Sequence, residues 1–144
     1  METFTAYLAG FGLAAAFGIG HHFALTGILK LAPHHGRHPK SVVVVTFVSL
    51  LALHTAEFTA LAGLNHWLFG PIFPDAFDGP VPDFADTLYV TGIAFTTLGY
   101  ASLDAVGAFR ILLLFQSLLG FMLLTWSATF LFSACQKTWQ KEEE

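Results

Sequence analysis

The stretch Thr96-Thr97-Leu98-Gly99-Tyr100-Ala101 decides the fold of this chain, because it lies between two apolar segments. A short segment, 87–95, precedes it, and a long uncharged segment, 111–134, follows it. Backbone carbonyls without partners are not tolerated in the hydrocarbon layer of a bilayer, so an irregular loop at that depth is held by protein or lines water and ions. The stretch therefore predicts a loop that dips into a membrane and returns.

The composition agrees with a membrane protein. Of the 144 residues, 55% are hydrophobic and 11% are charged, with a mean hydropathy of +0.65. A soluble domain carries about a quarter charged residues. Three segments are long enough to cross a bilayer, namely 4–31, 42–68 and 111–134. We predict an all-α integral membrane protein with three transmembrane helices and a short re-entrant helix over 87–95.

The basic residues predict the orientation. Five of the six lie at the end of the first span, in the loop before the second span, or after the third span: Lys30, Arg37, Lys40, Lys137 and Lys141. The segment 70–86, which joins the second span to the re-entrant helix, has four aspartates and neither Lys nor Arg. By the positive-inside rule, the N-terminus lies outside and the C-terminus is cytoplasmic. We expect a multi-pass protein of the plasma (inner) membrane.

The order of these segments has a parallel in a known family. Residues 88–100, Leu-Tyr-Val-Thr-Gly-Ile-Ala-Phe-Thr-Thr-Leu-Gly-Tyr, resemble the pore helix and selectivity filter of the potassium-channel superfamily, in particular its bacterial two-helix ion channels. Residues 110–112 resemble the start of the inner helix, and Gly120 lies where inner helices often carry a hinge glycine. The resemblance covers about 41–139.

That resemblance implies a division of the chain into three parts. Residues 1–40 would form an N-terminal transmembrane helix and a cytoplasmic His-rich loop. Residues 41–139 would form the pore domain, with outer helix, pore helix, filter and inner helix. Residues 140–144 would be an acidic tail.

The resemblance also implies roles for the filter residues. The Thr97 hydroxyl and carbonyl would form the innermost ion position, and the carbonyls of Leu98, Gly99 and Tyr100 would form the next rings. The usual ending is Gly-Tyr-Gly-Asp, whereas this chain has Ala101 and Ser102. We therefore expect a monovalent cation channel that conducts potassium with relaxed selectivity. Two alternatives stay open: a pore that no longer conducts, and an ordinary turn between two helices.

A ring of carbonyls needs about four filter strands, and one chain supplies one. No repeat of the motif occurs, so the resemblance and closed symmetry imply a homotetramer. The expected partners are the lipid bilayer and further copies of the chain, and the only expected metal ion is K⁺ at the filter, without a cofactor. The sequence lacks phosphate-binding loops, nucleophile motifs and basic patches, so neither an enzyme nor a nucleic-acid-binding protein is expected.

A pair of ionisable residues stands out in the second span. His54 and Glu57 are three residues apart and share a helix face. Ionisable groups inside a membrane are expensive and face protein or water. We interpret the pair as structural, anchoring the outer helix to the pore helix or inner helix. A proton-sensing role in gating is the other interpretation, since histidine titrates near physiological pH.

The histidines also support a different function class. They occupy the first span, the loop after it and the second span: His21, His22, His34, His35, His38 and His54. Imidazole ligates both metals and haem, so a membrane metal- or haem-binding protein is the alternative. However, His21 and His22 are adjacent and point to different helix faces, so both cannot readily serve one site.

The first span is not part of a minimal pore. Gly10, Gly12, Gly18 and Gly20 give it the small-residue spacing of close helix contacts. Two interpretations are open: a peripheral helix packed outside the pore domain, or a helix that blocks or regulates conduction.

Overall fold

The computed structural model describes residues 2–31, 39–68, 71–73, 75–77, 79, 82–99 and 105–140. It contains four helices, α1 (Glu2–Leu31), α2 (Pro39–Leu68), α3 (Phe84–Phe95) and α4 (Phe109–Gln140). Three of them hold apolar stretches of 28 residues, which measure about 42 Å at 1.5 Å per residue and so are long enough to cross a membrane. The predicted all-α architecture with three long helices and one short helix is confirmed.

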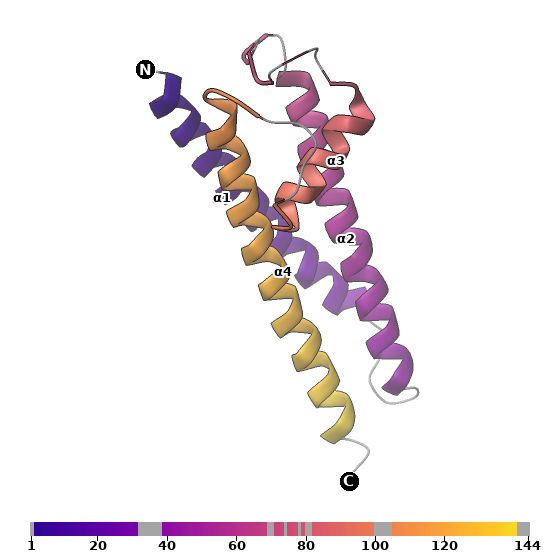
Figure 1. Ribbon diagram of the computed structural model, residues 1–144. Coiled ribbons are helices and arrows are strands. Elements are labelled where there is room, and N and C mark those ends of the chain that lie inside the picture. The colour runs from indigo at the N-terminus through magenta and orange to yellow at the C-terminus, as the bar shows by residue number, and fades with distance from the viewer. Residues whose placement is uncertain are drawn as a thin grey trace.

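The short helix α3 enters the bundle from one end and does not cross it (Figure 1). α3 begins at the end of the molecule where α2 finishes and stops part-way along α2 and α4, and α4 starts again at that same end (Figure 1). The N-terminal end of α1 lies at this end too, and the C-terminal end of α4 lies at the opposite one. A 12-residue helix rises only about 18 Å, which is too short to span the hydrocarbon layer.

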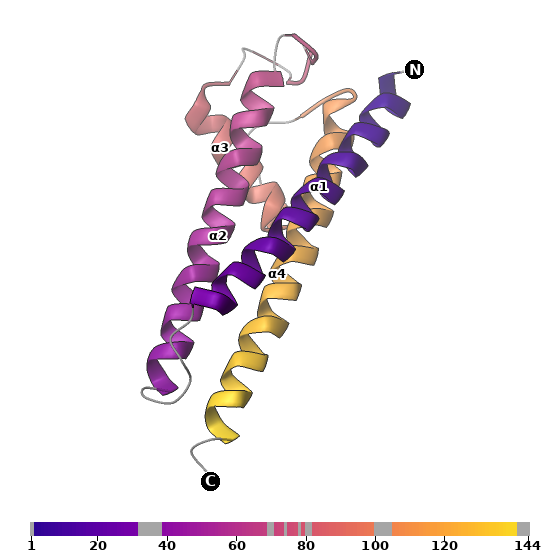
Figure 2. The same cartoon turned by 180° about the vertical axis from the view of Figure 1, so that it is seen from behind.

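α1 and α3 pack on opposite sides of the pair formed by α2 and α4 (Figure 2). α3 packs against α2 and α4, while α1 packs against α4 and, to a lesser extent, α2. Seen from behind, α1 crosses in front of the other helices and α3 lies on the far side (Figure 2). Within the described chain, α1 therefore packs on α4 and α2, and both interpretations of the first span stay predictions.

The core lies where the end of α3 meets α2 and α4. Leu61, Phe95, Leu119 and Leu123 form a buried cluster, and Phe95 is 1% exposed. Burying a side chain of this size contributes about 1.5–3 kcal/mol in water. Large apolar side chains remain exposed on the outer faces of the long helices, as expected for surfaces that face lipid or another subunit.

The loop before α3 determines where that helix starts. The Asp83 side chain caps α3 by accepting a hydrogen bond of 2.8 Å from the Asp86 backbone amide. The helix consequently begins at Phe84, three residues before the predicted start. Further along the fold, the Val106 amide donates to the Ala76 carbonyl at 2.8 Å, which pins the segment after α2 to the start of α4.

Only one of the four glycines proposed for close contact in α1 has that role. A Cβ at Gly10 would lie 2.6 Å from the Phe115 ring of α4. A Cβ at Gly12, Gly18 or Gly20 would meet no atom within 4 Å. The prediction of close packing is confirmed for Gly10 and is wrong for the other three within the described chain, because α1 crosses α4 at an angle and approaches it closely only locally.

Candidate functional site

The C-terminal end of α3 runs directly into the predicted filter. The Thr97 amide donates to the Ala94 carbonyl at 3.0 Å, and the Leu98 amide donates to the Ile93 carbonyl at 3.2 Å. This is the hydrogen-bond pattern of a Schellman motif, in which the residue after the cap is left-handed and usually glycine. Here that residue is Thr97, with φ of 59°.

A left-handed threonine is unusual, because its branched Cβ crowds the backbone. Such a conformation costs on the order of 1–3 kcal/mol and is concentrated at functional sites. Two residues later, Gly99 has φ of 71°, while Leu98 does not have a positive φ. Residues with positive φ therefore flank Leu98 on both sides in the described part of the loop. Gly99 thus takes a backbone turn that a β-carbon would resist.

The described residues of the predicted filter are exposed on the surface of the chain. Thr97, Leu98 and Gly99 are all exposed, and the Leu98 side chain is 70% exposed although it is apolar. The other predicted filter residues, Tyr100 and Ala101, lie outside the described residues, as does Ser102.

Gly120 of α4 seats the end of α3. A Cβ at this position would overlap the Phe95 carbonyl oxygen and lie 2.6 Å from its carbonyl carbon. Glycine therefore lets the α3 and α4 backbones meet directly. Gly120 is buried within an uninterrupted helix, and the predicted hinge role stays a prediction.

A buried amide network joins α3 to both of its neighbours. Asn65 of α2 donates to the Thr91 hydroxyl and to Gln116 Oε1, both at 2.9 Å. Gln116 Nε2 donates back to Asn65 Oδ1 at 2.7 Å. All three side chains are at most 1% exposed. The sequence analysis did not single out Asn65. The available signal was the presence of one side-chain amide in each of two apolar helices, Asn65 in α2 and Gln116 in α4.

Replacing Asn65 with Ala should loosen this junction. The change leaves Thr91 and Gln116 without their buried partner, so the free energy of unfolding should fall by on the order of 1–3 kcal/mol. Unfolding of purified protein in mixed micelles by increasing SDS measures this loss. Thr59→Ala, at an exposed position of α2, is the matched control. Equal unfolding of the two variants would contradict a stabilising role for the network.

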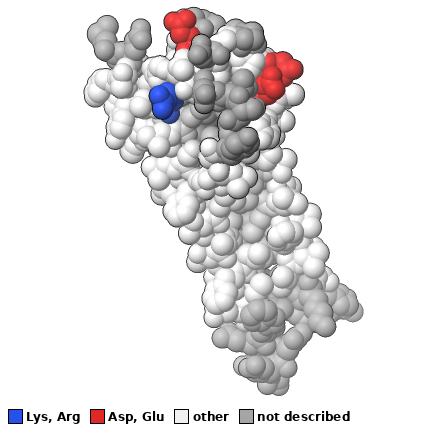
Figure 3. All heavy atoms as spheres, in the orientation of Figure 1, with Lys and Arg blue, Asp and Glu red and all other residues white. Residues whose placement is uncertain are grey.

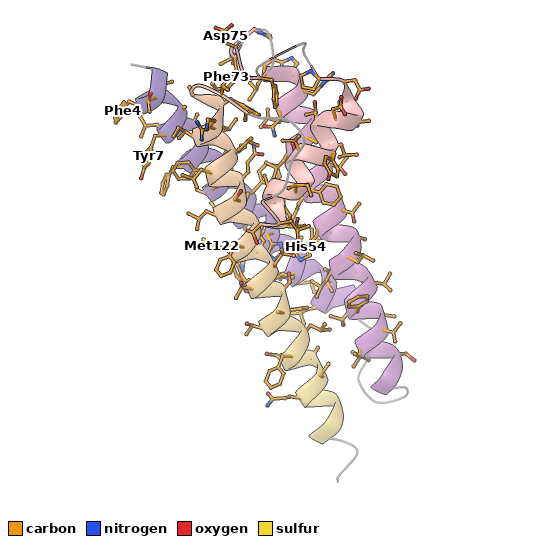
Figure 4. All side chains as sticks on the ribbon, viewed as in Figure 1. Phe4, Tyr7, His54, Phe73, Asp75 and Met122 are labelled. Carbon is orange, nitrogen blue, oxygen red and sulfur yellow. The ribbon has the colours of Figure 1, made fainter. Side chains whose placement is uncertain are left out.

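A second polar cluster lies beside the end of α3. The Glu57 carboxylate contacts His21 Nδ1 of α1 at 2.8 Å through Oε1 and His54 Nδ1 of α2 at 3.0 Å through Oε2. His21 Nε2 lies 3.2 Å from Ser127 Oγ of α4. The His54 ring is 6.1 Å from the Phe95 ring, and Figure 4 shows His54 close to the end of α3. One carboxylate thus connects two imidazoles from α1 and α2, and His21 extends the cluster to α4.

The cluster partly agrees with the prediction. His54 and Glu57 do share a helix face and are hydrogen-bonded. Their direct link, however, runs to His21 of α1 instead of to the pore helix or inner helix. Hydropathy gives no information on which helix faces α2. His22 is exposed whereas His21 is 1% exposed, which confirms that the two adjacent histidines point to different faces.

Charges gather at the end of the molecule that carries the α2–α3 connection. Asp75, Asp83 and Asp86 are exposed there, and Arg110 begins α4 at the same end. On the face shown in Figure 3, acidic side chains and one basic side chain are seen only near this end, and the middle is uncharged. An uncharged middle suits a lipid environment. The loop histidines His34, His35 and His38 lie outside the described residues.

The comparisons with known proteins agree with this geometry. No curated protein and no solved structure matches the chain. The family model described as "Ion channel" matches residues 42–137, which include α3 and most of α2 and α4. This places the chain among ion channels with a potassium-channel-like pore domain, not among enzymes, and gives no support to the metal- or haem-protein alternative as its function class. The chain belongs to the ion channel family.

Proposed function

We propose that this chain is one subunit of a potassium-conducting channel with relaxed selectivity, in which cations pass the backbone carbonyls of Thr97–Ala101. The observation that carries the proposal is the end of α3, where the left-handed Thr97 and Gly99 flank Leu98. In the filter that the loop resembles, successive backbone carbonyls point to the same side of the chain. A row of carbonyls on one side can replace the hydration shell of an ion.

In this proposal the channel is a homotetramer. One chain contributes one loop, and a ring of carbonyls needs about four. The exposed Leu98 and the exposed apolar residues Leu114, Leu118 and Phe121 of α4 support this assembly, because they would be covered by neighbouring subunits.

We propose that the pore domain spans 41–139, preceded by an accessory segment over 1–40 and followed by a tail over 140–144. The family match over 42–137 supports these limits. The filter would open to the outside of the plasma membrane, with the C-terminus in the cytoplasm. The acidic α2–α3 connection would lie outside, and the basic residues Lys30, Lys40 and Lys137 toward the cytoplasm.

The supporting residues have separate roles in the proposal. Glu57 and His54 hold α2 to α1, and Gly120 seats the pore helix on α4. The loop aspartates raise the local concentration of cations at the outer mouth.

A flux assay tests the proposal. Purified protein in liposomes should pass K⁺ faster than Na⁺ down matched gradients, and Ba²⁺ should block the K⁺ flux because it competes for the same carbonyl ring. Empty liposomes provide the background. Equal Ba²⁺-insensitive flux of the two ions would contradict a carbonyl filter, and no flux from verified tetramers would contradict conduction.

Ala101→Gly should raise the K⁺ over Na⁺ permeability ratio. If position 101 needs a left-handed or mirror-β backbone, as the resemblance implies, alanine costs on the order of 1 kcal/mol in each subunit and loosens the outer site. Glycine removes this cost. Ala101→Val is the opposite control and should lower the ratio. An unchanged ratio in the glycine variant would contradict this account of position 101.

A further inference from the structure

We propose that His21, His54 and Glu57 form a binding site for a divalent transition-metal ion of the zinc class, which would join α1 to α2. The three side chains come from two helices, and one ligand atom from each lies within 4.8 Å of the others. The proposal is independent of ion conduction, because none of the three residues belongs to the filter.

The donor geometry is close to that of a metal site. Both Nδ1 atoms point at the carboxylate and contact different oxygens of Glu57, at 2.8 and 3.0 Å. Zinc binds imidazole nitrogen and carboxylate oxygen at about 2.0–2.2 Å, so two donors of a tetrahedral ion lie about 3.4 Å apart. An outward shift of about half an ångström would bring the two N···O distances to this value. Side-chain torsions alone can supply such a shift.

Ser127 supplies the support that a metal-bound histidine needs. Ligating histidines commonly donate the other ring N–H to a hydrogen-bond acceptor, which fixes the tautomer. His21 Nε2 lies 3.2 Å from Ser127 Oγ. On metal binding, the proton moves from Nδ1 to Nε2 of a neutral His21, so Nδ1 can bind the ion and Nε2–H can donate to the hydroxyl. This exchange of tautomers releases no net proton.

The chemistry of the donors selects the class of ion. Two imidazoles and one carboxylate are the donors of open zinc sites, in which the fourth position is left for water. Imidazole favours Zn²⁺, Co²⁺, Ni²⁺ and Cu²⁺, whereas Mg²⁺ and Ca²⁺ require oxygen donors. The His21 side chain is fully buried, the Glu57 side chain is 8% exposed and the His54 side chain is 14% exposed. The His54 side of the cluster is therefore the open side, where water could complete the coordination.

Cobalt binding to the full-length protein tests the site. Co²⁺ bound by nitrogen and oxygen donors at four- or five-coordination gives visible ligand-field absorption. The absorption should disappear when Zn²⁺ displaces the Co²⁺. The purified protein in detergent should bind one Co²⁺ per chain. His22→Ala is the matched control and should bind equally, because His22 is exposed on another face of α1. His54→Asn keeps a side-chain N–H near the Nδ1 position and so preserves the hydrogen bond to Glu57, but it should weaken Co²⁺ binding at least tenfold.

A second measurement locates the ion. The Trp126 ring is 5.7 Å from the His21 ring. In a Trp67→Phe, Trp139→Phe background, Trp126 is the remaining tryptophan, and bound Co²⁺ should quench its fluorescence in parallel with the absorption. The proposal is overturned if wild-type protein shows no saturable Co²⁺ absorption, or if His54→Asn and wild type bind Co²⁺ equally.

Discussion

Gly120→Ala is expected to abolish ion flux and to destabilise the chain. The new Cβ would overlap the Phe95 carbonyl oxygen, so α3 and α4 must separate where the proposed filter begins. Overpacking a core costs about 1–3 kcal/mol, and occasionally more. A backbone carbonyl cannot rotate away as a flexible side chain can, so the upper part of this range is expected. The measurements are K⁺ flux in liposomes and SDS-induced unfolding.

Gly12→Ala is the matched control for this substitution. It makes the same chemical change inside a helix, but its Cβ would meet no atom within 4 Å. Alanine has the higher helix propensity, by about 1 kcal/mol, so this variant should be as stable as wild type or more stable. If Gly120→Ala and Gly12→Ala show equal K⁺ flux, the α3 and α4 backbones can separate without disturbing the loop after α3.

Glu57→Ala is also expected to lower the free energy of unfolding strongly. It removes the acceptor of two imidazole N–H groups at once, those of His21 and His54. The buried His21 donor left without a partner costs about 1–3 kcal/mol and the partly exposed His54 donor costs less, so the free energy of unfolding should fall by on the order of 2–5 kcal/mol. Unfolding in mixed micelles measures the change. Because α1 is held partly through this carboxylate, protease accessibility of the first helix should rise in the same variant.

Two further variants separate the hydrogen bonds from other effects. Glu57→Gln keeps one acceptor oxygen and should lose about half as much stability as Glu57→Ala. His22→Ala removes an exposed imidazole from the neighbouring position and should unfold as wild type does. If Glu57→Ala also unfolds as wild type does, the cluster does not hold α1 in place.

The long helices could be predicted from the sequence because lipid imposes a simple requirement. A segment such as 111–134 has no charged residue, and only a helix satisfies its backbone in a bilayer. The short helix and the loop after it could also be predicted, since Gly99 and Tyr100 follow a segment too short to span. The start of α3 was harder, because it depends on Asp83 acting as a cap within a loop that contains several aspartates.

The contacts between helices could not be predicted in the same way. His21, Asn65 and Ser127 each look like isolated polar residues in apolar segments, and their partners are 26 to 106 residues away in sequence. Which face of one helix meets another depends on side-chain packing throughout the molecule, not on hydropathy. Gly120 shows the same difficulty: a hinge and a close backbone approach both require glycine, and only the three-dimensional arrangement shows the contact with Phe95.

The Schellman motif at the end of α3 has a mechanical consequence. Ile93 and Ala94 accept the amides of Leu98 and Thr97, so the first part of the loop moves with the helix as one body. In a fourfold assembly, a small tilt of α3 would widen or narrow the innermost aperture in all four subunits together. Gly120 and Asn65 contact α3 through Phe95 and Thr91, so a movement at either contact could change the pore diameter without bending the loop.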